Sequence, residues 1–277
     1  MRLVVITGLS GSGKSIALKL LEDAGLYCMD NMPAELLPEA VAYLERQGCQ
    51  DAAVSIDVRS AGCLEHLPER LSQLQARIDL RVLFLDATDA ELVRRFSETR
   101  RRHPLSTGER SLEECLREER ELLAGLAALA YRLDTSELSA NALRAWVKDW
   151  LALSGANFTL VFESFGFKHG IPLDADLVFD VRCLPNPHYD PNLRPLTGKD
   201  AAVVDFLEAQ PQVDAMLADI RAYVEKWLPA YIQDNRAYFT VALGCTGGQH
   251  RSVYFAEALA EYFRGGQQVL VRHRGLS

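Results

Sequence analysis

Eight residues close to the start of the chain have the types and the spacing that hold a nucleotide phosphate. They are Gly8, Leu9, Ser10, Gly11, Ser12, Gly13, Lys14 and Ser15, and they match G-x-x-x-x-G-K-[S/T] at every position. Glycines here let successive backbone N–H groups converge on a phosphate, the lysine brings a positive charge, and the final hydroxyl reaches Mg²⁺. An apolar run, which predicts a strand, precedes the loop, and an amphipathic run, which predicts a helix, follows it. The dipole of that helix adds to the attraction between the loop and a phosphate. The motif predicts a nucleotide site; the alternative is a chance match in a Gly/Ser-rich loop.

A Mg²⁺ ion at such a loop also needs a carboxylate from the end of another strand. Asp86, which closes the run RVLFLD, is the first candidate to share the metal with Ser15, and Asp57, which closes VSID, is the second. Each acid could instead be a surface cap. The run ETRRRHPL carries residues 100–103, which predict either a lid that neutralises phosphate charge or a solvated helix end.

A second loop of small residues lies near the other end of the chain. It consists of Cys245, Thr246, Gly247, Gly248, Gln249, His250, Arg251 and Ser252, between an apolar and an amphipathic run. In cysteine-dependent phosphatases this pattern places a thiolate at a helix N-terminus to attack phosphorus, and the arginine holds two oxygens. Gly244 replaces the usual histidine, and Asp180 or Asp190 is the candidate general acid. Three interpretations stay open: an anion-binding loop, which we favour, an active phosphatase, and a structural turn around a buried cysteine.

Other polar groups fall where they can complete this second site. Asp180 ends an apolar run, and His188 lies in the proline-rich loop 184–198. Lys168 and His169 follow a further apolar run. A single histidine is more often a surface or core residue than a ligand, but several polar groups at strand ends of one small unit favour a shared site.

The elements that must position these groups follow from the spacing of apolar residues. In the first half, β-rich runs at 2–7, 52–58 and 81–87 alternate with helical patterns at 12–25, 89–101 and 111–130 and within 131–153. In the second half, β-rich runs at 158–165, 175–182, 238–244 and 268–274 flank helical stretches between 200 and about 234. Such alternation predicts βαβ units and mostly parallel sheets, and therefore an α/β fold. The break at 152–157 predicts a first domain at 1–153 and a smaller second domain at 154–277.

Composition limits the classes of protein that remain. The chain has 277 residues, a net charge of -8 and no apolar run long enough to span a membrane, so we expect a cytoplasmic protein without a generally basic surface. Six scattered cysteines without a C-x-x-C pair predict reduced thiols. Positive charge gathers at 100–103 and at Arg264, Arg272, His273 and Arg274, where a polyanion could dock.

These motifs, taken in order, resemble those of the bacterial RapZ family. From residue 1 to about residue 274 the chain reads GLSGSGKS, YCMDNMP, SIDVR, FLDA, ETRRRHPL, VFESFGFKHGIP, VFDVRCLPNPHYDPNLRPLTG and GCTGGQHRSV. The resemblance implies a first domain of P-loop kinase-like fold, with helices on both faces of its sheet, that binds ATP or GTP with Mg²⁺ and hydrolyses them slowly. It assigns ATP to residues 8–15 and GTP to Asp57, Val58, Arg59 and Ser60.

For the second domain, the resemblance implies a site for a phosphorylated amino sugar of the glucosamine phosphate type. The matching residues are Asp180, His188, Cys245, Thr246, Gly247, Gly248, His250 and Arg251. It further implies a homo-oligomer that binds small regulatory RNA, here assigned to Arg272, His273 and Arg274, and delivers it to an endoribonuclease that controls amino-sugar synthesis. Gln249 stands where the family commonly has a lysine. The rival hypotheses are a small-molecule kinase using Lys14 and the arginines at 100–102, and a phosphatase using Cys245.

Overall fold

The computed structural model describes residues 1–59, 64, 66–107, 109–152, 158–233 and 238–276. Contacts divide the chain into two compact units, Met1–Gly155 and Ala156–Ser277. The domain boundary expected at 153/154 falls outside the described residues. Within the described ranges, no helix is long and apolar enough to cross a membrane.

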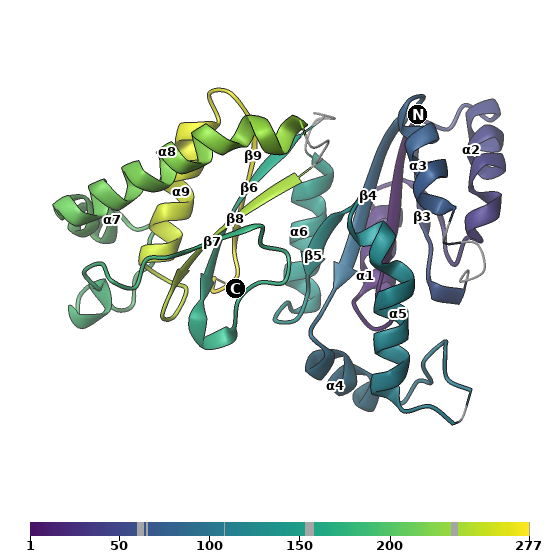
Figure 1. The fold of residues 1–277 in the computed structure, drawn as a ribbon, viewed down its shortest axis with the longest axis horizontal. Coiled ribbons are helices and arrows are strands. Elements are labelled where there is room, and N and C mark those ends of the chain that lie inside the picture. Colours follow the sequence, from purple (N-terminus) through teal and green to yellow (C-terminus); the bar gives the residue numbers. More distant parts are fainter. Residues whose placement is uncertain (60–63, 65, 108, 153–157, 234–237, 277) are drawn as a thin grey trace. The chain divides into compact units, whose positions relative to one another are not determined.

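The first unit is built on a parallel sheet with the strand order β2-β3-β1-β4-β5 (Figure 1). Its strands are β1 (Arg2–Gly8), β2 (Tyr27–Met29), β3 (Asp51–Ser55), β4 (Asp79–Asp86) and β5 (Tyr131–Asp134). All neighbouring pairs are parallel, so the carboxyl ends of the strands meet at one edge. Three predicted groups lie at this edge. The loop 8–15 begins where β1 ends, Asp57 follows β3, and Asp86 is the last residue of β4.

Helices cover both faces of this sheet. They are α1 (Lys14–Asp23), the short helix η1 (Ala34–Leu36), α2 (Leu37–Arg46), α3 (Leu67–Gln75), α4 (Asp89–Thr99), α5 (Leu112–Ala127) and α6 (Ala140–Ala152). Leu3 and Val5 of β1 share a buried cluster with side chains of α2, α3 and α5. Successive strand residues point to opposite faces, so Val4 and Ile6 face the other side, where α1 packs with α6. The parallel α/β sheet expected from the alternating pattern is confirmed.

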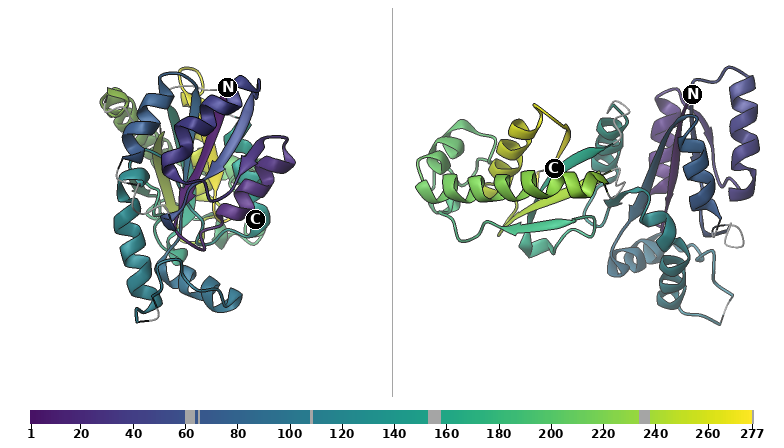
Figure 2. Two further views of the ribbon diagram at one scale, coloured as in Figure 1. Left: turned by 90° about the vertical axis from the view of Figure 1, so that its right-hand side faces the viewer. Right: turned by 45° about the horizontal axis from the view of Figure 1, so that its top comes forward.

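The second unit has a smaller parallel sheet with the order β7-β8-β6-β9. Its elements are β6 (Thr159–Gly166), η3 (Phe167–His169), β7 (Leu177–Asp180), η4 (Pro187–Tyr189), α7 (Ala201–Glu208), α8 (Pro211–Gln233), β8 (Tyr238–Cys245), α9 (Arg251–Phe263) and β9 (Gln268–His273). The long helix α8 and α9 share one buried cluster with Phe162 and Val241 of the sheet. The green helix α8 and the yellow helix α9 can be followed in Figure 2. Gly166 pairs with Cys245 and Asp180 with Gly244, so the predicted second loop starts at the carboxyl edge of this sheet.

Candidate functional site

The loop 8–15 joins β1 to α1 and depends on glycine for its path. Gly8 has φ 128°, and a Cβ there would lie 2.0 Å from the carbonyl oxygen of Leu85 on β4. Gly13 has φ 108° and precedes the first residue of α1. L-residues with a side chain rarely adopt such φ values, so the glycines of the motif are needed for the backbone geometry.

The side chain of Lys14 turns back into the loop that carries it. Its Nζ donates hydrogen bonds to the carbonyl oxygens of Gly8 at 2.6 Å and Leu9 at 3.0 Å. Burial lowers the pKa of this ammonium group, although the carboxylates of Glu119 and Asp57 act in the opposite direction. The positive charge therefore lies within the loop, next to the backbone that would surround a phosphate.

Several backbone N–H groups of this loop are available to an anion. Those of Gly11, Gly13, Lys14 and Ser15 form no hydrogen bond with any residue that the structure describes. The first N–H groups of a helix lack intrahelical partners and carry partial positive charge, which makes them a binding site for phosphate. The loop and the first turn of α1 therefore have the geometry for an anion.

Asp86, the first candidate for a metal-binding acid, has both carboxylate oxygens engaged. Oδ1 accepts from Arg120 at 2.8 Å and from the N–H of Ala87 at 2.7 Å. Oδ2 accepts from Nε of Arg132 at 2.9 Å and from a second nitrogen of the same side chain. The side chain is 1% exposed. Asp86 thus neutralises two arginines through both oxygens, and of the two sequence candidates we therefore prefer Asp57 for a metal ion.

Asp57, the second candidate, lies beyond β3, the strand next to β1. It is buried, and its Oδ1 accepts from the N–H of Arg59 at 2.9 Å, while the Arg59 side chain lies 3.6 Å from Oδ2. Arg59 also donates to Asn31 at 3.2 Å. Of the segment assigned to GTP, Val58 is buried and Arg59 exposed, and Ser60 lies outside the described residues.

The arginine segment, residues 100–102, is exposed at the end of α4. His103, by contrast, is buried, and its Nε2 lies 3.1 Å from Oε2 of Glu119 on α5. Glu119 also accepts from the N–H of Ser10 at 2.9 Å and from its hydroxyl at 2.7 Å. No local pattern marks this contact, because Glu119 lies 109 residues from Ser10 in an ordinary amphipathic helix.

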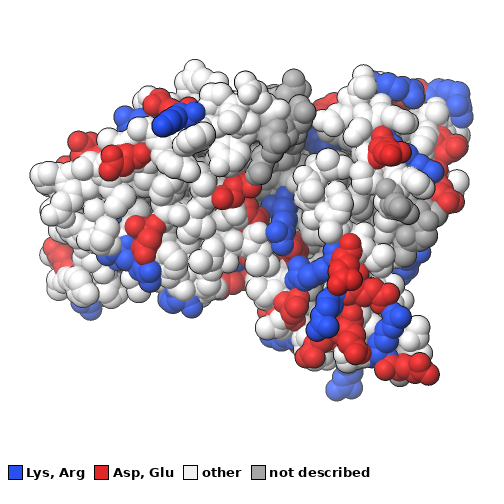
Figure 3. Space-filling model, in the orientation of Figure 1, with Lys and Arg blue, Asp and Glu red and all other residues white. Residues whose placement is uncertain are grey.

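Charges of both signs alternate over α4 and α5 (Figure 3). On α4, Arg94 pairs with Glu91 and Glu98; on the neighbouring segment, Arg110 pairs with Glu118 of α5. Exposed pairs of this kind contribute little to stability and leave no large field of one sign.

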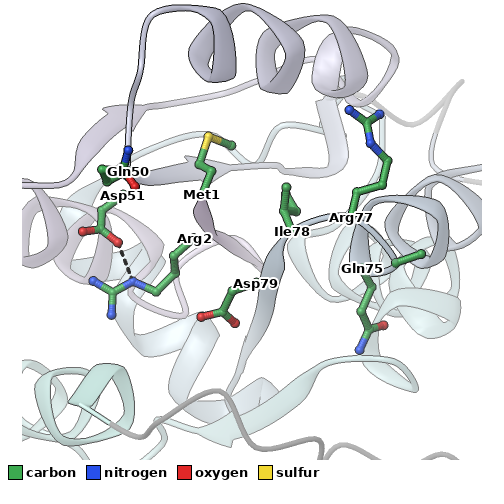
Figure 4. A pocket seen from close by; sticks show the side chains of 9 residues that line it. Met1, Arg2, Gln50, Asp51, Gln75, Arg77, Ile78 and Asp79 are labelled. Atoms are coloured by element: carbon green, nitrogen blue, oxygen red, sulfur yellow. Dashed lines mark ion pairs between the residues drawn. The ribbon is translucent and has the colours of Figure 1, made fainter.

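A separate hollow in the first unit lies at the opposite edge of its sheet (Figure 4). Its volume is about 790 Å³, and it is lined by the first residues of β1, β3 and β4, which include the ion pair of Arg2 with Asp51. These strand ends are remote from the carboxyl edge that carries the phosphate loop. We therefore place the candidate nucleotide site at the loop and not at this hollow.

In the second unit, Cys245 ends β8 and is 3% exposed. Its Sγ accepts from the N–H of Gly248 at 3.2 Å and lies 3.1 Å from Oγ of Ser252. Burial alone would raise the pKa of this thiol, but these hydrogen bonds and the charge of Arg251 outweigh burial and lower it. The loop thus stabilises negative charge at the start of α9.

Arg251 and His250 are also buried at this point and hold the loops together. One nitrogen, Nη1 of Arg251, donates at 2.8 Å to the carbonyl oxygens of both Arg182 and Leu184. Nε2 of His250 lies 3.1 Å from the carbonyl oxygen of Leu193, and burial lowers the pKa of this imidazole. Nη1 of Arg251 is therefore committed to backbone contacts, whereas its buried Nε has no hydrogen-bond partner among the described residues.

Two further predicted residues lie next to this loop. The rings of His188 and His250 are 6.2 Å apart, and His188 is exposed. Asp180 binds the Arg182 side chain; this hydrogen bond, more than the nearby charge of Arg251, holds the pKa of Asp180 below its ordinary value despite some burial. The structure thus brings together the residues predicted for the phospho-ligand site.

Two neighbours of this site were missed in the sequence. Arg182 lies 3.9 Å above the ring of Phe167, next to the site. A Cβ at Gly166 would lie 2.7 Å from the backbone of Gly247. The run DVR could have revealed Arg182, but no pattern marks Gly166.

The basic residues assigned to RNA do not form an exposed patch. Arg272 is 4% exposed and lies 2.9 Å from Asp174 and 3.3 Å from Glu163. The Arg274 side chain is 6% exposed and lies 3.9 Å from both of these acids. His273 contacts Ser164 at 2.8 Å. Buried, neutralised arginines present little charge to a phosphate backbone, and these contacts hold β9 in the unit. The assignment to RNA stays a prediction that this arrangement does not support.

Comparison with known proteins covers both halves of the chain. A family model of the RapZ-like N-terminal domain matches residues 1–155, and one of the RapZ C-terminal domain matches residues 158–277. A nucleotide-binding protein of Thiobacillus denitrificans is 60% identical over 100% of both chains. Another from Aromatoleum aromaticum is 60% identical over 99% of this chain and 94% of its own.

Solved structures resemble the first unit only at a distance. Shikimate kinase from Bacteroides thetaiotaomicron has a TM-score of 0.41 and 17% identity, over 55% of this chain and 99% of its own. A sugar kinase from Janibacter has a TM-score of 0.39 and 20% identity, over 55% and 94%. Likeness at this level carries no argument about activity. The two family models and the full-length relatives confirm the resemblance seen in the motifs: this chain belongs to the RapZ family.

Proposed function

We propose that the first unit binds ATP or GTP with Mg²⁺ and hydrolyses it slowly. The observation that carries the proposal is the loop 8–15. Four of its backbone N–H groups, those of Gly11, Gly13, Lys14 and Ser15, are unpaired within the described residues, and its lysine lies inside the loop. The relatives' description as nucleotide-binding proteins supports it.

The residues around the loop fit a Mg²⁺ ion that arrives with the nucleotide. Ser15 is exposed at the start of α1, and Asp57 lies beyond the adjacent strand. Within the described ranges, no three His, Cys, Asp or Glu side chains gather into a metal site. The ion would therefore take phosphate oxygens together with Ser15 and Asp57, and it would neutralise phosphate charge.

The second unit, in this proposal, binds a phosphorylated amino sugar at the loop 245–251. Support comes from the start of α9, from the lowered thiol pKa of Cys245, and from the neighbouring imidazole of His188. The Asp180 carboxylate binds Arg182 through both oxygens but is 46% exposed, so it can also accept from a sugar ammonium or hydroxyl group. A phosphatase is less well supported, because Arg251 donates to two backbone carbonyls.

Together the two sites suit a regulatory protein that binds a nucleotide at one site and a metabolite at the other. A homo-oligomer that delivers small regulatory RNA to an endoribonuclease is the output that the family membership suggests. Such RNA binding would have to use other positive residues, since Arg272 and Arg274 are buried against acids.

Calorimetry on the full chain tests the proposal. Lys14→Ala should weaken binding of ADP with Mg²⁺ by at least about tenfold, or 1.4 kcal/mol, while glucosamine phosphate binding is unchanged. His188→Ala, which changes an exposed side chain, should weaken the binding of glucosamine phosphate and leave the binding of ADP with Mg²⁺ unchanged. Each variant keeps one of the two ligands, and this retained binding shows that the variant is folded. If both variants bound both ligands as tightly as the wild type does, the assignment would be wrong. Rapid stoichiometric phosphorylation of a metabolite by ATP would instead establish the kinase alternative.

A further inference from the structure

We propose that Glu119 is a positioning residue that links the phosphate loop to the exposed arginine segment 100–102. The inference rests on the proposed nucleotide binding and concerns how that binding reaches another part of the same unit. Three chain segments meet at this carboxylate: the loop after β1, the segment between α4 and α5, and α5 itself.

The tautomer of His103 follows from its two contacts. Nδ1 accepts a hydrogen bond from the N–H of Leu105 at 3.2 Å, so this nitrogen carries no proton. The proton of the neutral ring therefore lies on Nε2, which donates to Glu119 at 3.1 Å. The Glu119 carboxylate thus accepts three hydrogen bonds, one from His103 and two from Ser10.

The charge of Glu119 is energetically tied to the phosphate loop. Its side chain is fully buried, and burial by itself would raise the carboxyl pKa. The hydrogen bond from His103, the positive charge of Lys14 and the bonds from Ser10 outweigh burial and lower that pKa. A buried charge depends strongly on each of its partners, so a change in the position of Ser10 or Lys14 changes the energy of the contact with His103.

The arginine segment is attached to the loop on its other side as well. Arg95 of α4 donates to the carbonyl oxygen of Gly11 at 3.1 Å. Gly11 also packs so closely on Phe96 that a Cβ at Gly11 would lie 3.3 Å from the ring. The rings of Phe96 and His103 are 5.4 Å apart. Residues 100–102 therefore lie between two anchors, and both anchors contact adjacent residues of the phosphate loop.

This arrangement predicts that a phosphate in the loop alters the arginine segment. An anion on the unpaired N–H groups attracts Lys14 and shifts the backbone at Ser10 and Gly11. Because Glu119 bonds both Ser10 and His103, that shift also changes the position of His103, which directly follows the arginine segment 100–102. Packed side chains and hydrogen-bond networks can carry coupling between two places in a protein, and the contacts from Ser10 through Glu119 to His103 form such a network.

The test uses the full-length protein and three variants. Glu119→Gln keeps the size of the side chain and removes its charge. Glu118→Gln is the matched control, because this adjacent residue of α5 is exposed and pairs with Arg110. His103→Leu removes the hydrogen bond on the arginine side, because leucine has no polar atom to donate to Glu119. Calorimetry first gives the affinity of each protein for ADP with Mg²⁺, and trypsin cleavage at 100–102 is then followed by mass spectrometry with and without saturating nucleotide.

In the wild type and in Glu118→Gln, we expect nucleotide to change the cleavage rate at 100–102 by at least about fivefold, the lower end of coupling between sites. At nucleotide concentrations that saturate each variant, the change in Glu119→Gln and His103→Leu should fall below about twofold. An unaltered response in these two variants would overturn the inference, as would a saturated wild type without a response. If Glu119→Gln fails to fold, His103→Leu decides. A wild type that binds no nucleotide would overturn the proposed function itself and this inference with it.

Discussion

Replacing Asp86 with asparagine should damage stability and spare nucleotide binding. The carboxylate is 1% exposed and binds Arg120 and Arg132. Removing one partner of a buried ion pair costs about 3–5 kcal/mol. The two arginines are 30% and 37% exposed, so water recovers part of this cost, and we expect a loss of about 2–3 kcal/mol. For a unit of this size, that lowers Tm by roughly 4–12 °C.

The measurement is urea unfolding of Asp86→Asn and the wild type, followed by circular dichroism. Calorimetry with ADP, with and without Mg²⁺, is done at a temperature where both are folded. Asp89→Asn is the control, because Asp89 binds the same Arg120 but is 63% exposed, and it should cost less than about 1 kcal/mol.

Asp57→Asn should show the opposite behaviour. We expect a small loss of stability and at least a tenfold loss, about 1.4 kcal/mol, in the affinity for nucleotide that depends on Mg²⁺. If Asp86→Asn were as stable as the wild type and lost the effect of Mg²⁺, our choice between the two acids would be refuted.

Three further results are expected. Gly8→Ala should cost roughly 3 kcal/mol or more in urea unfolding, because its Cβ would overlap a β4 carbonyl; Gly25→Ala, with open space around it, should cost only about 1–2 kcal/mol. The thiolate absorbance of Cys245, taken as wild type minus Cys245→Ser, should persist to lower pH than that of an ordinary thiol, since its pKa is lowered; a transition at or above pH 9.0 would contradict this. The pKa of Glu257 is lowered because contacts with Lys199 and His273 outweigh burial. Its contribution to the free energy of unfolding is therefore present above pH 4.5 and is lost as the pH falls through the pKa of the folded state. Glu257→Gln should therefore cost about 1 kcal/mol at pH 7, and equal stabilities there would refute the reasoning.

The alternation of apolar runs was sufficient to predict the two parallel sheets. It missed β2, whose three residues are too few to show a period. The helical stretches expected between 200 and about 234 are α7 and α8, although the pattern did not place the boundary between them.

The phosphate loop could be recognised without any structure, because that motif encodes local backbone geometry through glycines with positive φ and a lysine at a set spacing. Family membership likewise follows from local motifs. Which charges are paired and buried became clear from the folded chain alone. It pairs Asp86 with arginines from α5 and β5, places Glu119 on Ser10 across 109 residues, and buries Arg272 on Asp174 across 98. The energy of a charge depends on its partners and its exposure to water, and for these residues the partners come from distant parts of the chain.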